Sequence, residues 1–566
     1  MRYHVLATDY DGTLARDEHV SGDSIASLRS LKASGRKLIM VTGRVLPDLL
    51  KVFPEYKLFD LIVAENGALI YNPATLNERL LGVRPPDAFI QKLESLKVSS
   101  LSVGKVIVAT WDPHHTVVLN LIKEMGMEYQ VIFNKGAVMI LPPGINKASG
   151  LHAALKELGI SAHNTVAIGD AENDNAMLQS VECAVAVNNA LPQVKAIADW
   201  TTNQRNGDGV SELIDQLLKD DLSILDHKLS RHLLKLGKCS DGSVFYINPY
   251  GRTVLLAGTS GSGKTTLAAA FIEKLIEKHY QFCLVDPEGD YLEMAGVITI
   301  GDSSQPPNVE NVIKVLTQPS QNVVVCILAI HLNDRPAFFK KLLTALANLR
   351  NATGHPHYII MDEAHHLIPK ESPISFFNLD EDFKNLFAIT TRPDLINHSF
   401  LKRINTTITM GDLPGKTMEE FAEIIDAKID IPVDIVIETG EVLVWQKDQN
   451  ETLIVICSIP GHLLQRHKRK YATGDMGYNS FYFRGPANKL NLRANNLLTF
   501  IQMGSGVDDE TWLYHLKRND YFNWFRGSVK DESLAESAEH MNKNFSAGKS
   551  RQEIFKMIQE RYTSTA

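Results

Sequence analysis

The sequence predicts an α/β protein in which two parallel-sheet domains follow one another and a small, mainly helical domain comes last. Residues 1 to about 215 alternate short β-branched runs with segments of helical periodicity, which is the pattern of β-α-β units. The same alternation returns between about 238 and 458, and the β-branched runs become sparse after residue 459. The length agrees with several domains, because 566 residues exceed what one hydrophobic core serves.

The composition is that of a folded protein, with 44% hydrophobic and 22% charged residues. The formal net charge of -8 gives no overall attraction to nucleic acid or anionic membranes, so any nucleic-acid contact is expected to be local. The apolar run 323–330 is too short to span a bilayer, and five scattered cysteines fit reduced thiols. We therefore expect a cytoplasmic protein without a membrane segment.

The first domain divides into a core and an insertion. The regular alternation covers 1–75 and 145–218, and a less regular stretch over 76–144 interrupts it, as an inserted cap domain would. Residues 219–237 show helical spacing of apolar side chains and end in a glycine, so we predict a connecting helix there. The second domain is predicted over 238–458 and the mainly helical domain over 459–566.

Carboxylates gather at the ends of predicted strands in the first domain. The run LATDYDGTL delivers Asp9 and Asp11. A spacing of two on an extended segment puts both on one side, so that one can attack phosphorus while the other moves a proton. Two carboxylates beside a phosphate need a cation. In TVAIGDAENDNAML another apolar strand delivers Asp170 and Asp174, which suit a metal ion.

Two further pieces complete this set. VTGR places Thr42 at a strand end, and INKASGL places Lys147 before a helix. In this order the four pieces resemble the motifs of the haloacid dehalogenase superfamily over residues 1 to 215, which implies a Rossmann-like parallel sheet, Mg²⁺ and a phosphomonoester substrate. The resemblance implies the following roles: Asp9 as nucleophile and metal ligand, Asp11 as general acid and base and as metal ligand through its backbone carbonyl, Thr42 and Lys147 as phosphoryl ligands, Asp170 as metal ligand and Asp174 as its support.

The insertion carries a narrower resemblance. Its position between Thr42 and Lys147, together with the phrase AENGALIYN, resembles the Cof-like subgroup. That resemblance implies sugar phosphates and similar small monoesters as substrates. The insertion is short for this subgroup, so a phosphorylated macromolecule stays open as a substrate.

A phosphate-binding loop opens the second domain. TVLLAGTSGSGKTTLAAAFIEKL reads as a buried strand, a loop matching G-x-x-x-x-G-K-[ST] and a helix. Backbone N–H groups of such a loop surround phosphates, the lysine neutralises the β and γ groups, and the threonine after it reaches Mg²⁺. We expect ATP to bind at Gly258, Thr259, Ser260, Gly261, Ser262, Gly263, Lys264, Thr265 and Thr266, with Thr265 also binding Mg²⁺.

Catalytic groups for ATP hydrolysis are predicted further along the chain. In HYIIMDEAHH the apolar strand leads to Asp362, which would hold the Mg²⁺ shell, and to Glu363, which would polarise water. An acid at this second position favours hydrolysis over transfer to a substrate. Transition-state charge on the γ-phosphate needs a cation, for which Arg392 and Arg403 are candidates; a surface ion pair is an equally weighted interpretation of each.

Two phrases narrow the ATPase class. LVDPEGDYLEM and FAITTRPDLINHSFLKRINTTITMGD resemble the D-x-x-G-E-Y and Q-R-P elements of HerA, VirB4 and related ring-forming motor ATPases, over about 238–458. The resemblance implies a RecA-like P-loop α/β domain and a homo-oligomer, with a hexameric ring as the arrangement typical of the class. Asp290 stands where those proteins have Glu, and Thr391 where they have Gln. The first domain takes the place of the HerA-type N-terminal barrel.

The two resemblances together predict a Mg²⁺-dependent phosphomonoester hydrolase coupled to an ATP-hydrolysing module. Two alternatives stay open. One is a polynucleotide kinase-phosphatase, in which Asp286 or Glu288 would activate a 5′-hydroxyl, although Glu363 favours hydrolysis. The other is an ATP-gated regulatory or defence assembly with the phosphatase as effector. The basic segment 466–471 is a candidate contact for nucleic acid, although a solvated basic face is the favoured interpretation.

Overall fold

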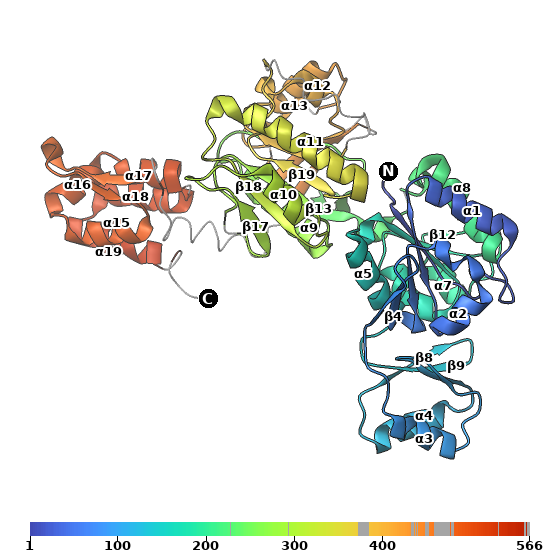
Figure 1. The fold of residues 1–566 in the computed structure, drawn as a ribbon. Helices are drawn as coiled ribbons and strands as arrows, with labels where there is room; N and C mark the ends of the chain where they lie inside the picture. The colour runs from blue at the N-terminus through green and yellow to red at the C-terminus, as the bar shows by residue number, and fades with distance from the viewer. Residues whose placement is uncertain are drawn as a thin grey trace.

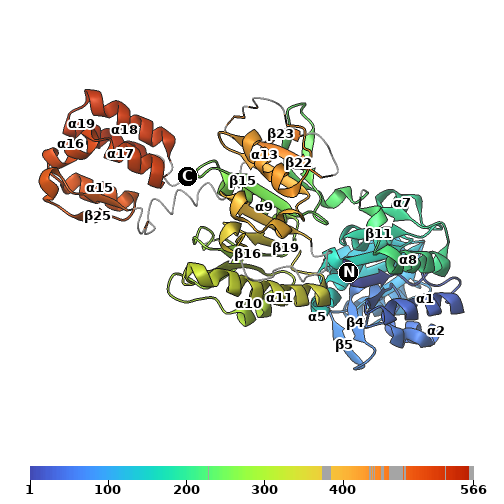
Figure 2. The same cartoon turned by 90° about the horizontal axis from the view of Figure 1, so that it is seen from above.

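Two large, mostly parallel sheets organise the chain, and a smaller helical domain follows them (Figures 1 and 2). The computed structural model describes residues 1–226, 228–292, 294–371, 384–431, 440–447, 452–457, 480–529 and 531–559, together with residues 435, 437, 438, 476 and 562. The predicted α/β class is confirmed. Among the described residues, none of the helices combines the length and the apolar character that crossing a bilayer requires.

The first sheet has the strand order β12-β11-β10-β1-β2-β3-β4-β5. Its central strands are buried along nearly their whole length, because helices cover both faces, and so they read as continuous apolar runs. The strands are β1 (Val5–Thr8), β2 (Lys37–Val41), β3 (Leu61–Ala64), β4 (Leu69–Asn72), β5 (Asn77–Leu80), β10 (Thr165–Gly169), β11 (Cys183–Ala186) and β12 (Trp200–Thr201). The helices are α1 (Gly22–Ala33), α2 (Leu46–Val52), α5 (Lys147–Leu158), α6 (Asn175–Gln179), α7 (Pro192–Ile197) and α8 (Asn206–Asp220).

The insertion forms a separate four-stranded antiparallel sheet with two helices, at the end of the first domain away from the second one (Figure 1). Its elements are α3 (Asp87–Ser95), β6 (Ser102–Val103), β7 (Val108–Trp111), α4 (His115–Glu124), β8 (Gln130–Asn134) and β9 (Ala137–Leu141). The insertion begins later than residue 76. Strand β5 pairs antiparallel with β4, Leu80 opposite Leu69, and therefore belongs to the core sheet.

The second sheet has eleven strands, in the order β14-β13-β23-β22-β21-β15-β20-β19-β16-β18-β17. Its strands are β13 (Leu234–Cys239), β14 (Val244–Ile247), β15 (Val254–Gly258), β16 (Phe282–Asp286), β17 (Val297–Ile300), β18 (Asn322–Cys326), β19 (Tyr358–Met361), β20 (Leu386–Thr390), β21 (Thr406–Met410), β22 (Glu441–Gln446) and β23 (Thr452–Cys457). Strands β15 to β21 are parallel, whereas the four strands at one edge are antiparallel. The helices are α9 (Lys264–Glu277), α10 (Val309–Leu316), α11 (Arg335–Thr353), α12 (His398–Leu401) and α13 (Pro414–Ile425).

The predicted connecting helix over 219–237 does not form among the residues of this segment that the structure describes. Helix α8 ends at Asp220, short 3-10 turns follow at 223–225 and 230–232, and strand β13 begins at Leu234. The apolar spacing has another origin, because Leu222, Leu225 and Leu229 pack into the core of the first domain. Strand β13 then pairs antiparallel with β14 and β23.

The C-terminal domain is mainly helical and holds an aromatic core in which Trp512, Phe500 and Phe483 are fully buried. Its elements are β24 (Phe481–Phe483), β25 (Leu492–Ala494), α15 (Leu497–Gly506), α16 (Asp509–Lys517), α17 (Asp520–Trp524), α18 (Glu532–Asn544) and α19 (Ala547–Ile558). The basic segment 466–471, our candidate contact for nucleic acid, lies outside the described residues.

Candidate functional site

Neighbouring strands of the first sheet deliver two aspartates to the same edge. Strands β1 and β10 are parallel neighbours, and Asp9 and Asp170 follow them directly. Lys147, the first residue of α5, lies between carboxylates: its Nζ is 2.6 Å from Asp9 Oδ1 and 2.6 Å from Asp174 Oδ1. One carboxylate oxygen from each of Asp9, Asp170 and Asp174 lies within 4.8 Å of the other two. The structure therefore brings four of the predicted residues into one buried cluster.

Local hydrogen bonds orient these side chains. Asp174 Oδ2 accepts the backbone N–H of Asp170 at 2.9 Å and the next N–H at 3.0 Å. A capping box between Asn146 and Ser149 fixes the first turn of α5, from which Lys147 projects. The cluster is thus set by the backbone of two strand ends and one helix start.

Burial and mutual repulsion shift the acidities in this cluster. Burial raises the pKa of Asp9 to about 8, and the nearby Asp174 and Asp170 add to the shift, against the opposing charge of Lys147. Burial likewise raises the pKa of Asp170. Burial alone would lower the pKa of Lys147, but the carboxylates of Asp174 and Asp9 outweigh it and hold the pKa above its ordinary value.

This charge balance suits a divalent cation. Three buried carboxylates face one buried ammonium, which leaves an excess of negative charge. Carboxylate oxygens are ligands that Mg²⁺ prefers. The residues present therefore fit this ion, with Asp9 and Asp170 as the side chains that would hold it and Asp174 positioned behind them.

Asp11 and Thr42 lie at the same edge but outside the cluster. The carboxylate of Asp11 accepts two hydrogen bonds from Arg44, at 2.7 Å each, and is 46% exposed. Our expectation that Asp9 and Asp11 share one side of a strand is wrong for this conformation, because β1 ends at Thr8 and the chain turns at Gly12, whose φ is +84°. Thr42 is buried directly after β2, and its hydroxyl accepts the N–H of Arg44.

Sequence reasoning missed one cation of this site. Lys135 lies in the two-residue turn between β8 and β9 of the cap, and its Nζ is 2.5 Å from Asp170 Oδ2. Both turn residues, Lys135 and Gly136, have positive φ, as a tight hairpin requires. The phrase NKG between two apolar runs signals such a turn, but nothing in the sequence indicates that the turn reaches the carboxylates.

The phosphate-binding loop joins β15 to α9 in the second domain. Gly261 and Gly263 have φ of +80° and +99°, and a Cβ at Gly258 would lie 2.4 Å from the carbonyl oxygen of Met410. Lys264 is buried, and its Nζ donates to the carbonyl of Thr259 at 2.7 Å. The same segment contains the other predicted residues: Ser260 and Ser262 lie in the loop, and Thr265 and Thr266 lie in the first turn of α9.

Acidic side chains lie at the neighbouring strand ends. Asp362 follows β19, and burial, with the charges of Asp286 and Glu363 adding, raises its pKa well above the ordinary value. Asp286 accepts the backbone N–H groups of residues 288 to 291 at 2.7 to 3.1 Å. Its two oxygens therefore hold the loop after β16, which argues against Asp286 as a base for a 5′-hydroxyl.

The two candidate arginines lie at opposite edges of the sheet: Arg392 follows β20 at the edge of the phosphate-binding loop, and Arg403 lies at the other edge. Arg392 donates two hydrogen bonds to Asp394, at 3.0 and 2.9 Å, and its side chain is 57% exposed. Of the two interpretations of Arg392, the surface ion pair is therefore the one that agrees with this structure. Arg403 precedes β21, whose first residue pairs with Val254 at the start of β15. It lies at the edge of the sheet opposite to the phosphate-binding loop and is not placed to reach a nucleotide bound to its own chain.

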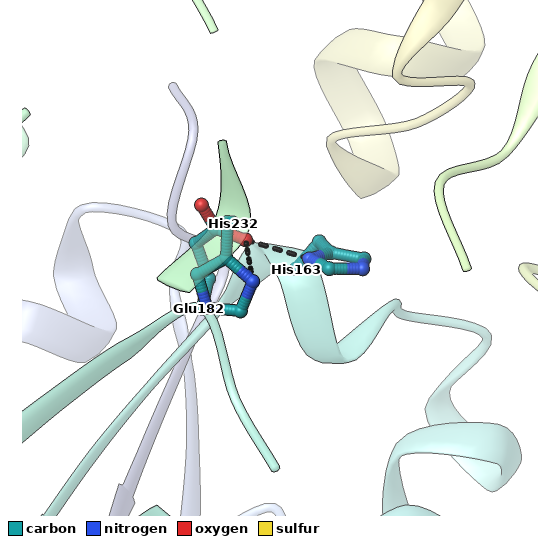
Figure 3. A group of neighbouring side chains, drawn as sticks. All are labelled: His163, Glu182 and His232. Atoms are coloured by element: carbon teal, nitrogen blue, oxygen red, sulfur yellow. Dashed lines mark hydrogen bonds and ion pairs between the residues drawn. The ribbon is translucent and has the colours of Figure 1, made fainter. Parts of the chain in front are cut away.

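A third polar cluster joins the two domains (Figure 3). The Glu182 carboxylate is fully buried and contacts Arg2 and His163 at 2.6 Å each; the Tyr280 hydroxyl of the second domain donates to it at 2.9 Å. His232 Nδ1 lies 3.8 Å away. Burial alone would raise the pKa of Glu182, but the hydrogen bond from His163 and the charge of Arg2 hold it well below its ordinary value.

These three side chains could hold a metal ion, since one ligand atom each of His163, Glu182 and His232 lies within 4.8 Å of the other two. The carboxylate is already saturated with donors, however, and the guanidinium of Arg2 beside it repels a second cation. We therefore interpret this cluster as a hydrogen-bonded joint between the domains.

These folds and sites define an enzyme with two phosphate-handling centres, a phosphatase and a P-loop ATPase. The sequence model of the haloacid dehalogenase-like hydrolases matches residues 6–110 and 116–214, and the model described as "Helicase HerA, central domain" matches residues 235–447. Phosphoglycolate phosphatase 2 of Saccharolobus solfataricus is 33% identical over 219 residues, which are 38% of this chain and 92% of that protein. The chain belongs to the haloacid dehalogenase-like hydrolase family through its first domain, and its second domain is of the HerA type.

Other relatives match the same part of the chain. Phosphoglycolate phosphatase of Methanothermobacter thermautotrophicus is 28% identical over 225 residues, 38% of this chain and 98% of that protein. A solved haloacid dehalogenase-like hydrolase of Bacteroides thetaiotaomicron matches 38% of this chain and 99% of its own, at 20% identity and a TM-score of 0.33.

Proposed function

We propose that this enzyme hydrolyses small phosphomonoesters with Mg²⁺ through an aspartyl phosphate, and that ATP hydrolysis in the second domain is coupled to this reaction. One observation carries the phosphatase assignment: Lys147 lies 2.6 Å from both Asp9 and Asp174, beside the buried Asp170. This arrangement offers a nucleophile, a fixed cation for the phosphoryl oxygens and carboxylates for a metal ion in one place.

The reaction follows from these roles. An oxygen of Asp9 attacks phosphorus and the ester P–O bond breaks, while Asp11 gives a proton to the leaving oxygen. Asp11 then takes a proton from the water that splits the aspartyl phosphate, which releases phosphate and restores Asp9. Bound Mg²⁺ would supply charge neutralisation on the phosphoryl group. Asp11 must first exchange its two hydrogen bonds with Arg44 for the substrate, so rotation of the Asp11 side chain belongs to the catalytic cycle.

The substrate class follows from the cap. Lys135 brings an ammonium to within 2.5 Å of Asp170, which suits a monoester with a second anionic group. The relatives named phosphoglycolate phosphatase point to the same chemistry, because phosphoglycolate carries a carboxylate next to its phosphoester. We propose small carboxylated monoesters as the preferred substrates.

In the second domain, Lys264 and Thr265 would bind ATP and its Mg²⁺ with Asp362, and Glu363 would orient the attacking water. Because Arg392 is paired with Asp394 and Arg403 lies at the opposite edge of the sheet, we propose that an arginine of a neighbouring subunit completes the site. A homo-oligomer such as a ring is the assembly that supplies it.

The test is a phosphate-release screen of the purified protein with Mg²⁺. The substrates are 2-phosphoglycolate, sugar phosphates, nucleotides and 3′-phosphorylated DNA, each with and without ATP. We expect turnover of 2-phosphoglycolate that Asp9→Asn abolishes, and ATP turnover that Lys264→Ala abolishes. Release from DNA ends alone, or labelled phosphate transferred to a DNA 5′ end, would instead support a polynucleotide kinase-phosphatase. ATP-dependent assembly with little ATP turnover would support a regulatory assembly.

A further inference from the structure

The two catalytic domains meet at the ends of their sheets that are opposite to their catalytic residues. On the phosphatase side the joint contains His163 and Asn164, directly before β10, and Gly159, directly after α5. On the ATPase side it contains Lys278 after α9 and His357 before β19. These are strand starts and helix ends in both domains.

Hydrogen bonds across the joint are specific and buried. His163 Nε2 lies 2.7 Å from the carbonyl oxygen of Lys278, and the Tyr250 hydroxyl donates to the carbonyl of His163 at 3.0 Å. Asn164 donates to the carbonyl of Gly354 at 3.3 Å, and its Oδ1 lies 3.1 Å from His357 Nε2. Asn164 and His357 are almost fully buried. Since each group loses its partner if the domains shift, the joint resists sliding.

His163 binds two acceptors at once. Its Nδ1 lies 2.6 Å from the carboxylate of Glu182, and its Nε2 faces the carbonyl of Lys278. The two ring nitrogens thus face one oxygen atom in each domain. The ring also stacks on Tyr280, with centroids 3.8 Å apart. A buried anion of one domain is thereby tied to the last turn of a helix of the other.

Single elements run from this joint to the catalytic residues. Helix α9 begins at Lys264 of the phosphate-binding loop and ends next to Lys278, a length of about 21 Å at helical rise. Strand β10 begins after Asn164 and ends before Asp170, a length of about 16 Å. Helix α5 likewise starts at Lys147 and ends at Leu158, and the carbonyl oxygen of the next residue, Gly159, lies 3.0 Å from His355 Nε2.

We propose that His163 and Asn164 are positioning residues that transmit the state of the ATP site to Asp170 and Lys147. ATP binding holds the start of α9, the joint carries the resulting shift to β10 and α5, and the affinity of the phosphatase for its transition state changes. The inference rests on the proposed function, because it assumes that both sites bind their ligands. Thermodynamic linkage then requires the effect to be reciprocal.

Substitution of two tyrosines removes hydrogen bonds of the joint without removing a side-chain ring. Tyr250→Phe and Tyr280→Phe each remove one hydroxyl that crosses between the domains and keep the ring. Neither residue belongs to a catalytic site. Tyr246→Phe is the matched control, because Tyr246 is exposed on β14 of the same domain. Thermal unfolding of each variant establishes that it is folded, and the single Tyr280→Phe variant serves if the double variant is not.

The experiment measures the dissociation constant of a ligand at each site, with and without a ligand bound at the other site. The probes are a non-hydrolysable ATP analogue and, with Mg²⁺, beryllium fluoride as a mimic of the aspartyl phosphate. We expect beryllium fluoride to change the dissociation constant of the analogue at least about fivefold, and the analogue to change that of beryllium fluoride by the same factor. The double variant should bring both factors close to one, and Tyr246→Phe should retain them.

A kinetic measurement complements the binding data. The analogue should shift the Mg²⁺ concentration that gives half-maximal phosphatase activity in the wild type, and it should not shift this concentration in the double variant. A loss of stability alone does not produce this difference between the two proteins. Three outcomes would overturn the proposal. The dissociation constants could be independent of each other in the wild type, or they could change by the same factor in the double variant as in the wild type. The effect of beryllium fluoride on binding of the ATP analogue could also persist in Asp9→Asn. Absence of phosphate release from every substrate would instead contradict the proposed function, because the binding factors are measured without turnover.

Discussion

At the scale of single residues, the phosphatase site is a balance of buried charges. Asp9, Asp170 and Asp174 exceed the charge of Lys147, and burial, with the charges of Asp174 and Asp170 adding, raises the pKa of Asp9. Lys135 reduces it from the cap side without being buried, since its side chain is 46% exposed. Such a partly exposed cation can leave Asp170 when a metal ion and a substrate arrive.

The first prediction concerns the pH dependence of Mg²⁺ binding. The pKa of Asp9 lies at about 8 in the folded protein, above its ordinary value of 3.8, so the metal-free fold loses stability as pH rises through this window. Mg²⁺ needs the ionised carboxylate and must displace a proton below pH 8. We expect the affinity to rise by up to roughly tenfold per pH unit between about pH 6 and pH 8, with about one proton released.

Calorimetric titrations in buffers with different ionisation enthalpies measure both quantities. The Asp9→Asn variant is the control, because it cannot release this proton. An affinity that is independent of pH in this range would show that Asp9 is already ionised without the metal.

The second prediction concerns Lys135. Replacement by Met keeps most of the side-chain length and removes the charge. We expect kcat/KM for 2-phosphoglycolate to fall roughly 10- to 100-fold, because a hydrogen bond to a charged group contributes about 1.5–3 kcal/mol. Hydrolysis of ethyl phosphate, which lacks the carboxylate, should change little, and Lys135→Arg should retain most of the activity. Equal losses on both substrates would mean that Lys135 does not select the leaving group.

At the scale of elements, the site depends on how closely α5 approaches the sheet. A Cβ at Gly150 would lie 2.5 Å from Val63 Cγ1 and 2.6 Å from Gly67 Cα. Gly67 itself has a φ of +104° and faces the carbonyl of Asn146. Two glycines therefore allow the helix that carries Lys147 to contact the backbone after β3.

The third prediction tests this contact. Gly150→Ala should lower the free energy of unfolding by about 1–3 kcal/mol, because the added methyl group meets backbone that cannot give way, and should lower kcat because α5 moves with Lys147. Gly22→Ala is the control; nothing lies within 4 Å of a Cβ at this position of α1, so a change under about 0.5 kcal/mol is expected. Urea unfolding and phosphate release measure both effects. Normal stability in Gly150→Ala would show that α5 has room to shift.

Elements also show what the sequence could predict. The alternation of strands and helices predicted both parallel sheets, and the ends of β1 and β10 carry Asp9 and Asp170 to one edge because parallel neighbours share their direction. The orientation of Asp11 could not be predicted, because the end of β1 depends on a turn. The contact of Lys135 joins residues far apart in the sequence, in two different sheets. The spacing of Leu222, Leu225 and Leu229 is that of the apolar face of a helix, and this spacing led to the wrong prediction of a helix over 219–237.

At the scale of the whole molecule, the Glu182 joint connects the two catalytic domains, and we expect them to unfold as one cooperative unit. Its carboxylate has donors from both domains and no access to water in the described structure, since its exposed fraction is zero. Separation of the domains would remove the Tyr280 hydroxyl from this carboxylate, which would keep Arg2 and His163 of its own domain as partners.

The fourth prediction follows from this burial. Glu182→Gln should lower the free energy of unfolding by about 3–5 kcal/mol, because the guanidinium of Arg2 loses its buried counter-charge. Calorimetry should show one transition for the two catalytic domains in the wild type and two in the variant. Glu157→Gln is the control, since Glu157 forms an exposed pair with Arg79 and should change stability by less than about 1 kcal/mol. A single, unshifted transition in Glu182→Gln would contradict this view of the joint.

The joint also determines how the two reactions meet the surrounding solution. Because the joint lies at the strand starts of both sheets, the two groups of catalytic residues lie at the ends of their sheets away from the joint, and the cap lies at the end of the first domain remote from the second domain (Figure 1). A molecule released at one centre is diluted in bulk water before it meets the second. The two sites are therefore mechanically connected, but we expect no molecule to pass directly from one site to the other. An enzyme that removes free phosphate from the medium should then leave any effect of ATP on the phosphatase unchanged.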